Sequence, residues 1–244
     1  DFERIPAGES GERTRVVDRI ETPVPAAALR EMVAYRHRQL HGDFAVHADM
    51  REYAPDPLTI GMTGSSGLVG TALAALLTTG GHSVVRIVRS SPGSSDERQW
   101  NPDDPAPDLL EGLDAVVHLA AIPAPGLATD ATTFHNNVPA TYNVFKAAAA
   151  AGVRNVVWTS SETTLGLPMG PDNPPPYLPV DEDVLRPETT YALGKHLEEA
   201  MAEQFARWHH GMKLIGLRLS NVMRPEDYAA FDGWQDDPLT RIWN

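Results

Sequence analysis

Three short segments of the 244-residue chain combine residue types that can do chemistry. They are Gly64-Ser65-Ser66-Gly67-Leu68-Val69-Gly70, Thr159-Ser160-Ser161 and Tyr191-Ala192-Leu193-Gly194-Lys195. Glycines between a strand and a helix let backbone N–H groups approach a diphosphate, whose charge the helix N-terminus favours. A hydroxyl, a phenol and an ammonium can position and exchange a proton. Together the segments predict a dinucleotide pocket with a proton-transfer site beside it.

Tyr191 and Lys195 are four residues apart, so on a helix both side chains lie on one face, about one turn apart. A phenol with a pKa near 10 is a poor base at neutral pH, and a neighbouring ammonium stabilises its phenolate form. We therefore expect Lys195 to lower the pKa of Tyr191, the catalytic acid and base. Ser161 is expected to hydrogen-bond the reacting substrate oxygen, and Ser160 is the nearest alternative for that role.

The cofactor preference is predicted from the end of the second strand, about 20 residues after the glycines, where dinucleotide folds contact the adenosine ribose. Arg89 and Ser90 occupy that position, and no acidic residue follows before Asp96. An arginine beside hydroxyl groups suits a 2′-phosphate, whereas a carboxylate would suit the free ribose. The chain is therefore expected to bind NADP, with NAD as the alternative.

The elements that must position these residues alternate regularly after residue 57. Apolar runs predict strands at 58–62, 83–88, 115–119, 155–159 and 214–219, and helices at 68–77, 141–151 and 191–208. Short apolar strands joined by helices indicate parallel pairing with both sheet faces covered. We therefore predict an α/β fold, a doubly wound parallel sheet of the Rossmann type over residues 58–244, with the Pro-rich 167–187 as a surface loop near the site.

The N-terminal part is expected to be separate from this sheet. Alternation predicts a strand over 13–20, and helical periodicity begins at residue 26 and fades by about residue 52. Two prolines within 53–57 disfavour helix on either side, so this stretch is interpreted as a linker. Residues 1–52 thus form a strand-helix extension.

The motifs as a set resemble the short-chain dehydrogenase/reductase superfamily, in its extended branch, the NAD(P)-dependent epimerase/dehydratase family. The resemblance rests on the Gly-x-x-Gly-x-x-Gly spacing, on Asp114-Ala-Val-Val-His118-Leu119-Ala120-Ala121 and on Asn137-Val138 before Thr141 and Asn143. It implies an enzyme that moves hydride between the cofactor and a hydroxyl or carbonyl carbon of a sugar or sugar-nucleotide-like substrate. It further implies that Leu119, Ala120, Ala121, Asn137 and Thr159 lie beside the cofactor, that Lys195 holds the nicotinamide ribose and that His118 is structural.

Substrate contacts are expected from Ser161, Glu162 and Asn221. In dehydratases of this family an Asp-Glu pair occupies the positions of Glu162 and Thr163, and only one acid is present here. The resemblance therefore favours epimerisation or simple redox chemistry over dehydration. A non-catalytic NADP-binding sensor or scaffold is the alternative from another functional class.

The resemblance also bears on both ends of the chain. Residues 13–48 resemble the last strand and helix of a START/polyketide-cyclase-like domain, so 1–52 is interpreted as a remnant of one. The chain ends soon after Asn221, where extended members continue, and the substrate-covering segment is therefore expected to be truncated. Family members commonly dimerise through the helix that carries Tyr191, which makes a homodimer an expectation.

Composition limits the partners. A formal charge of −13 and a pI near 5.0 oppose binding to nucleic acid and to anionic membranes. Cysteine is absent, and the most apolar run is far shorter than the roughly 20 residues of a membrane helix. His37 and His41 lack a nearby third ligand, so no metal is expected. These features predict an unexported, cytoplasmic protein that acts on a small molecule.

Overall fold

The computed structural model describes residues 2–8, 11–16, 19, 21–90, 92–104, 106–167, 169, 172–224 and 227–229. The chain divides into two compact units, Asp1–Tyr53 and Ala54–Asn244. In the first unit, β1 (Phe2–Gly8) and β2 (Gly11–Val16) form an antiparallel hairpin, and α1 (Ala26–Tyr53) follows. The strand predicted over 13–20 therefore begins and ends earlier, and its partner β1 was not predicted.

The second unit contains a six-stranded, wholly parallel sheet. Its elements in chain order are β3 (Thr59–Thr63), α2 (Leu68–Thr79), β4 (Ser83–Val88), β5 (Glu97–Gln99), the 3-10 helix η1 (Pro107–Leu110), β6 (Ala115–His118), α3 (Asp130–Ala151), β7 (Asn155–Ser161), the 3-10 helix η2 (Glu162–Leu165), α4 (Thr190–Trp208) and β8 (Lys213–Leu219). The spatial order of the strands is β5-β4-β3-β6-β7-β8. This is the predicted doubly wound, Rossmann-like arrangement.

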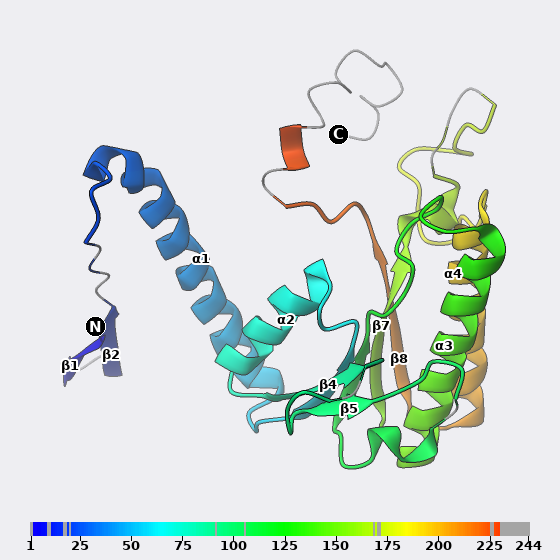
Figure 1. Cartoon of the computed structure of the whole chain (residues 1–244), viewed down its shortest axis with the longest axis horizontal. Coiled ribbons are helices and arrows are strands. Elements are labelled where there is room, and N and C mark those ends of the chain that lie inside the picture. The colour runs from blue at the N-terminus through cyan, green and yellow to red at the C-terminus, as the bar shows by residue number, and fades with distance from the viewer. Residues whose placement is uncertain are drawn as a thin grey trace. The chain divides into compact units, whose positions relative to one another are not determined.

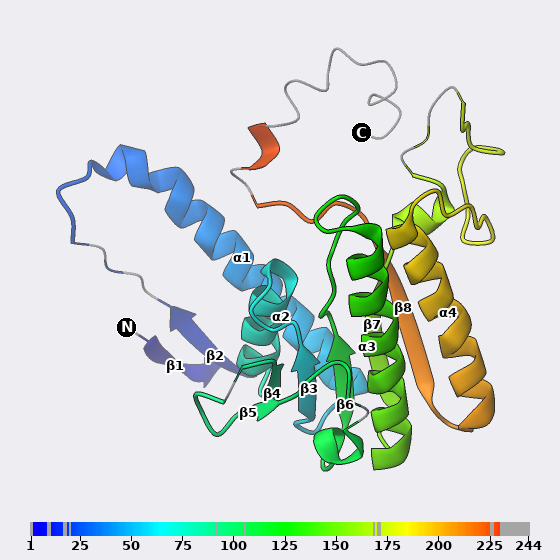
Figure 2. The same cartoon turned by 45° about the vertical axis from the view of Figure 1, so that its right-hand side comes forward.

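The helices of the second unit cover opposite faces of the sheet. Figures 1 and 2 show α2 on one side and α3 and α4 packed side by side on the other. The chain reverses direction across the sheet between β3 and β6, because the first three strands run outward from β3 and the next three run the other way. In such sheets the loops at the carboxyl ends of the strands diverge at this point and leave a cleft for a ligand.

Aromatic packing between α3, α4 and β7 builds the core beneath that edge. Phe145 of α3 is fully buried, with its ring centroid 5.1 Å from that of Trp158 and 5.7 Å from that of Phe205. Edge-on pairs of this kind stabilise a core beyond the area they bury. Gly216 of β8 passes directly under Trp158, where an added Cβ would lie 2.6 Å from the indole ring. This packing fixes α4 against β7 and β8.

One predicted boundary is wrong, and one strand was missed. The helix expected from residue 141 begins at Asp130, where the Thr129 side chain caps it by accepting from the Thr132 amide at 3.2 Å. Pro139 lies inside α3 and removes one helical hydrogen bond without ending the helix, because tertiary packing holds both halves. Strand β5 was not predicted, since three residues carry too little periodicity to be recognised.

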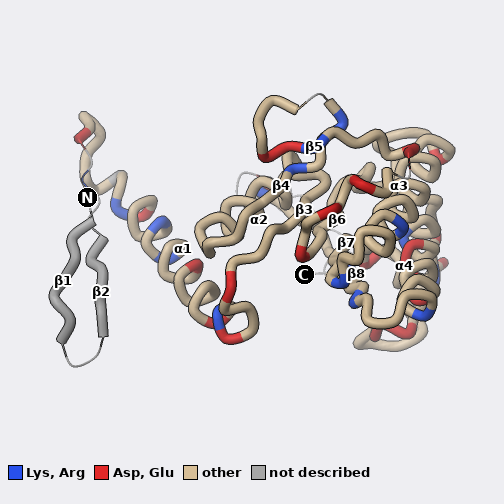
Figure 3. Tube along the Cα trace, turned by 90° about the horizontal axis from the view of Figure 1, so that it is seen from below, with Lys and Arg blue, Asp and Glu red and all other residues tan. Residues whose placement is uncertain are grey.

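Acidic and basic side chains are interspersed along the described chain. Figure 3 shows both signs on α1 and on α4, with no element carrying an extended basic stripe. Among the helices that the structure describes, none combines the length and the apolar composition needed to cross a membrane.

Candidate active site

A cleft of about 1110 Å³ opens at the carboxyl edge of the sheet, and the three chemistry-bearing segments meet there. The strands β3, β4, β6 and β7 all end at this edge, so residues distant in the chain become neighbours. The predicted site residues that line the cleft are Gly64, Ser65, Ser66, Gly67, Leu68, Val69, Arg89, Ser90, Leu119, Ala120, Ala121, Thr159, Ser161, Glu162, Tyr191 and Asn221. Asn137 and Lys195 do not line it.

The glycine turn between β3 and α2 has no room for side chains. Gly64 has a φ of +68°, and an added Cβ would lie 2.7 Å from the Ala120 amide nitrogen. A Cβ on Gly70 would overlap the Gly64 carbonyl oxygen. Gly67 is the N-cap of α2 and offers no capping side chain, so the first-turn N–H groups are left for a ligand. Such a turn suits the diphosphate of a dinucleotide.

Ser161 is oriented by the residue two positions after it. Its Oγ accepts from the Thr163 amide at 3.2 Å and from the Thr163 hydroxyl at 3.0 Å. Both lone pairs are then engaged, so the Ser161 proton is free to donate toward Tyr191, whose pKa Ser161 lowers. Thr163 thus has a structural reason to stand where a dehydratase would carry an acid.

The pKa of Tyr191 is shifted in the direction opposite to the prediction. Burial raises it above its ordinary value, the Ser161 hydrogen bond opposes that rise, and the charge of Glu198 adds to it. The expected lowering by Lys195 is not found. Burial of the phenol is the largest cause of the rise, and Lys195 is not among its causes.

Lys195 is buried, with 3% of its surface exposed. Its Nζ donates to the Thr159 carbonyl at 2.8 Å and to Glu198 Oε2 at 3.0 Å, and lies 6.0 Å from the centroid of the Tyr191 ring. Lys195 and Tyr191 do share a face of α4, as their spacing predicts. Glu198 was missed because an acid three residues after a lysine is usually a surface pair.

Ser160 is held away from the role considered for it. Its hydroxyl donates to Glu199, which also forms a two-point ion pair with Arg218 at 2.9 and 2.8 Å. Its proton is therefore committed to a carboxylate, whereas Ser161 directs its proton to Tyr191. Of the two serines, Ser161 is the better placed.

Asn137 braces a loop from behind the cleft. Its Oδ1 accepts from the Ile122 amide at 2.8 Å and its Nδ2 donates to the Ile122 carbonyl at 3.0 Å. Asn137 does not line the cleft, because both ends of its amide are committed to the segment after β6, and its place beside a bound cofactor stays a prediction. That segment, residues 122–125, lines the cleft instead.

Sequence reasoning missed other lining residues. They are Glu97, Trp100, Pro102, Ile122, Pro123, Ala124, Pro125, Asn136, Ala140, Leu219 and Ser220. Trp100 is 4% exposed, and its indole nitrogen donates to the Asp104 carbonyl at 2.9 Å. A single tryptophan after an unrecognised short strand carried no usable signal. Glu97 lines the same cleft as Arg89, and its Oε2 accepts from the Gly93 amide at 2.6 Å.

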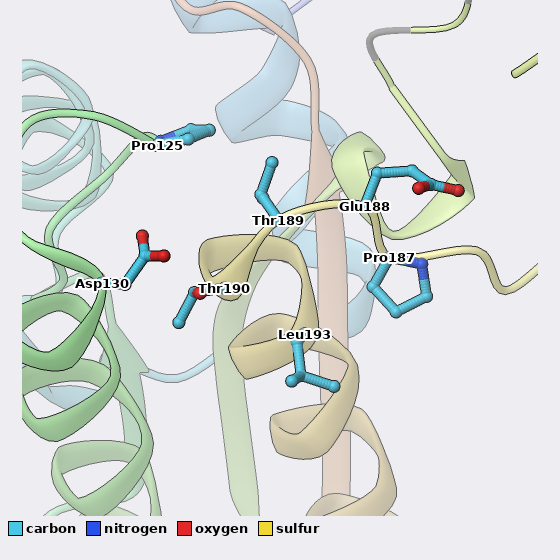
Figure 4. A pocket seen from close by; sticks show the side chains of 7 residues that line it. All are labelled: Pro125, Asp130, Pro187, Glu188, Thr189, Thr190 and Leu193. Carbon is cyan, nitrogen blue, oxygen red and sulfur yellow. The ribbon is translucent and has the colours of Figure 1, made fainter. Parts of the chain in front are cut away.

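A smaller depression of about 420 Å³ adjoins the cleft, with Pro125 lining both. Figure 4 shows it between the first turns of α3 and α4, with Asp130 and Thr190 from the two helices and Glu188 directed away from Asp130. The lining combines carboxylates, threonine hydroxyls and prolines. It offers hydrogen-bond acceptors next to the site of Tyr191.

Comparison with known proteins gives relatives of one kind. The NAD dependent epimerase/dehydratase family matches residues 60–234. L-arabinose 1-dehydrogenase (NAD(P)(+)) of Haloferax volcanii is 29% identical over 177 residues, which are 69% of this chain and 68% of that protein.

Two solved structures share the fold. A nucleoside-diphosphate sugar epimerase from Corynebacterium glutamicum has a TM-score of 0.74 at 27% identity and covers 95% of this chain. A short-chain dehydrogenase/reductase superfamily protein from Agrobacterium tumefaciens with bound NAD has a TM-score of 0.57 at 34% identity and covers 68% of this chain. The chain spans 50% of the length of each. The family match, which includes the glycine turn, Ser161, Tyr191 and Lys195, extends over more than half of the chain, and the chain belongs to the NAD dependent epimerase/dehydratase family.

Proposed function

We propose that the protein is an NADP-dependent oxidoreductase or epimerase that acts on a hydroxyl-bearing carbon of a sugar-like substrate. The observation that carries the proposal is the approach of Tyr191 and Ser161 to each other in one cleft with the glycine turn. Neither group alone indicates an activity. A proton-transfer pair beside a diphosphate cradle is an arrangement suited to hydride-transfer chemistry.

The fit of a dinucleotide is supported by the cradle itself. Gly64 and Gly70 leave only backbone at the turn, and the first-turn N–H groups of α2 face outward without a side-chain cap. At the other end, Arg89 and Ser90 line the cleft, and Arg89 forms no ion pair with any residue that the structure describes. A guanidinium that is free to bind a 2′-phosphate favours NADP. Glu97, which also lines the cleft, is a carboxylate and would suit the free adenosine ribose of NAD.

Residues of the chain itself would accept and return the proton of the substrate hydroxyl. When bound, the nicotinamide supplies an acceptor and donor of hydride. Tyr191 would take the proton from the substrate hydroxyl in oxidation and return it in reduction, while Ser161 holds the same oxygen by a hydrogen bond. Both side chains are buried, with 7% of each exposed, so water competes little for the reacting oxygen. Lys195 does not line the cleft, and it would act on the site by donating from Nζ to the Thr159 carbonyl.

A sugar-like substrate is supported by the relatives and by the lining. The matched proteins include an L-arabinose dehydrogenase and a nucleoside-diphosphate sugar epimerase. Glu162 and Asn221 offer polar contacts in the cleft, and Asp130 and Thr190 offer more in the adjoining depression. Dehydration is disfavoured because Thr163, which orients Ser161, stands where the second acid would be needed.

The test is replacement of the phenol. In Tyr191→Phe, kcat for NADPH-coupled turnover of aldoses or UDP-sugars should fall by about 10²–10⁴-fold, because the proton-exchanging group is lost. The dissociation constant for NADPH should stay within about twofold, since the diphosphate contacts lie elsewhere. Tyr142→Phe is the matched control, because Tyr142 lies on α3 outside the cleft lining and should keep full turnover. Turnover retained by Tyr191→Phe would overturn the proposal, and a wild-type chain that binds NADPH without any turnover would favour the sensor alternative.

A further inference from the structure

Glu198 is a buried carboxylate that the reaction above does not use. It is 0% exposed on α4, one turn after Lys195, and its Oε2 lies 3.0 Å from the lysine Nζ. Its Oε1 is also buried and has no hydrogen-bond partner of good geometry among the described residues. An isolated buried carboxylate is costly, so its presence requires a compensating interaction.

A chain of oriented hydrogen bonds leads to this carboxylate from the glycine turn. Thr63 and His118 end two adjacent parallel strands and are paired in register. The Thr63 hydroxyl accepts from the amides of Leu119 at 3.1 Å and Ala120 at 3.2 Å. With both lone pairs used, its proton must point to His118 Nδ1, which is 2.7 Å away. The Nδ1 atom is therefore an acceptor.

The donor-to-acceptor direction of these hydrogen bonds continues through the imidazole ring of His118. Burial lowers the pKa of His118 to about 3, with the charge of Lys195 as a smaller cause, so the ring is neutral at ordinary pH. Because Nδ1 accepts, Nε2 carries the proton and donates to the Thr141 hydroxyl at 3.1 Å. The Thr141 proton is then left to face Glu198. Burial raises the pKa of the Glu198 carboxyl above its ordinary value, and the charge and hydrogen bond of Lys195, with the Thr141 hydroxyl, oppose that rise. The chain of donors ends at the carboxylate.

The same carboxylate determines what Lys195 can do for Tyr191. Two of the three ammonium protons are committed to Glu198 and to the Thr159 carbonyl. The positive charge is thus compensated within the buried pair, and a negative charge stands about two turns along α4 from Tyr191. We propose that Glu198 is a positioning residue that neutralises the Lys195 ammonium and thereby sets the pH range in which Tyr191 exchanges its proton. The catalytic meaning of this assignment rests on the proposed function.

Other charged groups near the phenol do not replace Glu198. From β7 and α3 the facing groups are the uncharged Ser161 and Thr141, and from β6 it is the neutral His118. Glu199 is neutralised by Arg218 of β8, with which it forms the two-point ion pair. Glu162 of η2 is half-buried in the open cleft, where solvent screens its charge. Along α4, His196 lies between Lys195 and Glu198 in sequence, with its Nδ1 buried and without a hydrogen-bond partner among the described residues. Lys195 and Glu198 are the buried ion pair of this helix.

The test measures the phenol directly. The chain labelled with ¹³C at tyrosine Cζ is titrated by NMR, and the Tyr191 resonance is assigned by its absence in Tyr191→Phe. In Glu198→Gln the midpoint should fall by about one pH unit or more, a tenfold loss of proton affinity, because the opposing charge is gone and the ammonium is uncompensated. Glu203→Gln makes the same change at an exposed position of α4 and should leave the midpoint unchanged. Glu198→Asp keeps the carboxylate and should move the midpoint less than Glu198→Gln.

An unchanged or raised midpoint in folded Glu198→Gln would overturn the assignment. If that variant fails to fold because Lys195 is left unpaired, Lys195→Met is compared with Lys195→Met combined with Glu198→Gln. The double variant should then have the same midpoint as Lys195→Met, because Glu198 has no ammonium left to neutralise, and a lower midpoint in the double variant would also overturn it. Since the titration needs no turnover, an inactive wild-type chain would refute the proposed function and leave this measurement valid.

Discussion

At the scale of single residues, spacing predicted which side chains share a face and missed what else is buried there. Tyr191 and Lys195 lie on one face of α4, and Ser161 is directed to the phenol, as the motifs indicate. The sequence could not predict the partner of Lys195, because burial of Glu198 depends on α3 and β7 packing against α4. Nor could the sequence predict that the Asn137 side chain binds the backbone of a loop 15 residues away.

His118 supplies a prediction about stability and pH. The pKa of its folded form is about 3, against about 6.5 when unfolded, so only the unfolded chain gains this proton as the pH falls below 6.5. The contribution of the neutral His118 ring to the free energy of unfolding is therefore complete above about pH 6.5, and it is lost as the pH falls toward 3. Between pH 7 and pH 5 the free energy of unfolding should decrease by about 2 kcal/mol from this group alone.

Urea unfolding at the two pH values checks this dependence. His118→Gln should be less stable at pH 7 but should lose about 2 kcal/mol less than the wild type on going to pH 5. His135→Gln, at an exposed position of α3, should behave like the wild type. Equal losses in wild type and His118→Gln would show that another group governs acid sensitivity.

At the scale of elements, the strands with apolar runs were predictable and the short strand β5 was not. The strands β3, β4, β6, β7 and β8 lie within two residues of their predicted bounds, because each contains an apolar run. The run predicts the strand even in β8, where Ile215 is 50% exposed. Helix α3 was shortened in the prediction by Pro139, a residue that usually ends a helix. Packing of α3 against α4 and η1 outweighs the low helix propensity of Pro139 at this position.

The strand-turn-helix unit from β3 to α2 makes Gly70 a sensitive position. In Gly70→Ala the added methyl group would overlap the Gly64 carbonyl oxygen and lie 2.8 Å from the Ser65 Cα. Because backbone cannot yield as a flexible side chain does, the free energy of unfolding should fall by about 1–3 kcal/mol. NADPH affinity should fall too, since the turn that approaches the diphosphate is displaced. Both are measured by urea unfolding and fluorescence titration.

The control for this change is Gly93→Ala. Gly93 is exposed in the loop between β4 and β5, and its added Cβ would meet only Glu97 Oε2 at 3.6 Å, an ordinary contact. It should alter neither quantity appreciably. A Gly70→Ala chain as stable and as tight in NADPH binding as Gly93→Ala would mean that the close approach at the turn is unimportant.

At the scale of the whole molecule, the chain contains two units and the site belongs to the second. The predicted order of strands and helices was enough to bring their carboxyl ends, and hence the three motifs, to one edge. The match to a sugar epimerase over 95% of the chain also requires most of the first 53 residues, so the N-terminal unit is part of what the two proteins share. Its START-like origin and a homodimer formed through α4 stay predictions.

The central claim is that Ser161 and Tyr191 face a nicotinamide whose diphosphate lies on the glycine turn. A crystal structure of the chain with NADP bound tests it most directly. The account predicts diphosphate oxygens within hydrogen-bond distance of the first-turn N–H groups of α2, the 2′-phosphate at Arg89, and the nicotinamide ring beside both hydroxyls. A diphosphate bound away from that turn, or a ring remote from Tyr191, would contradict it.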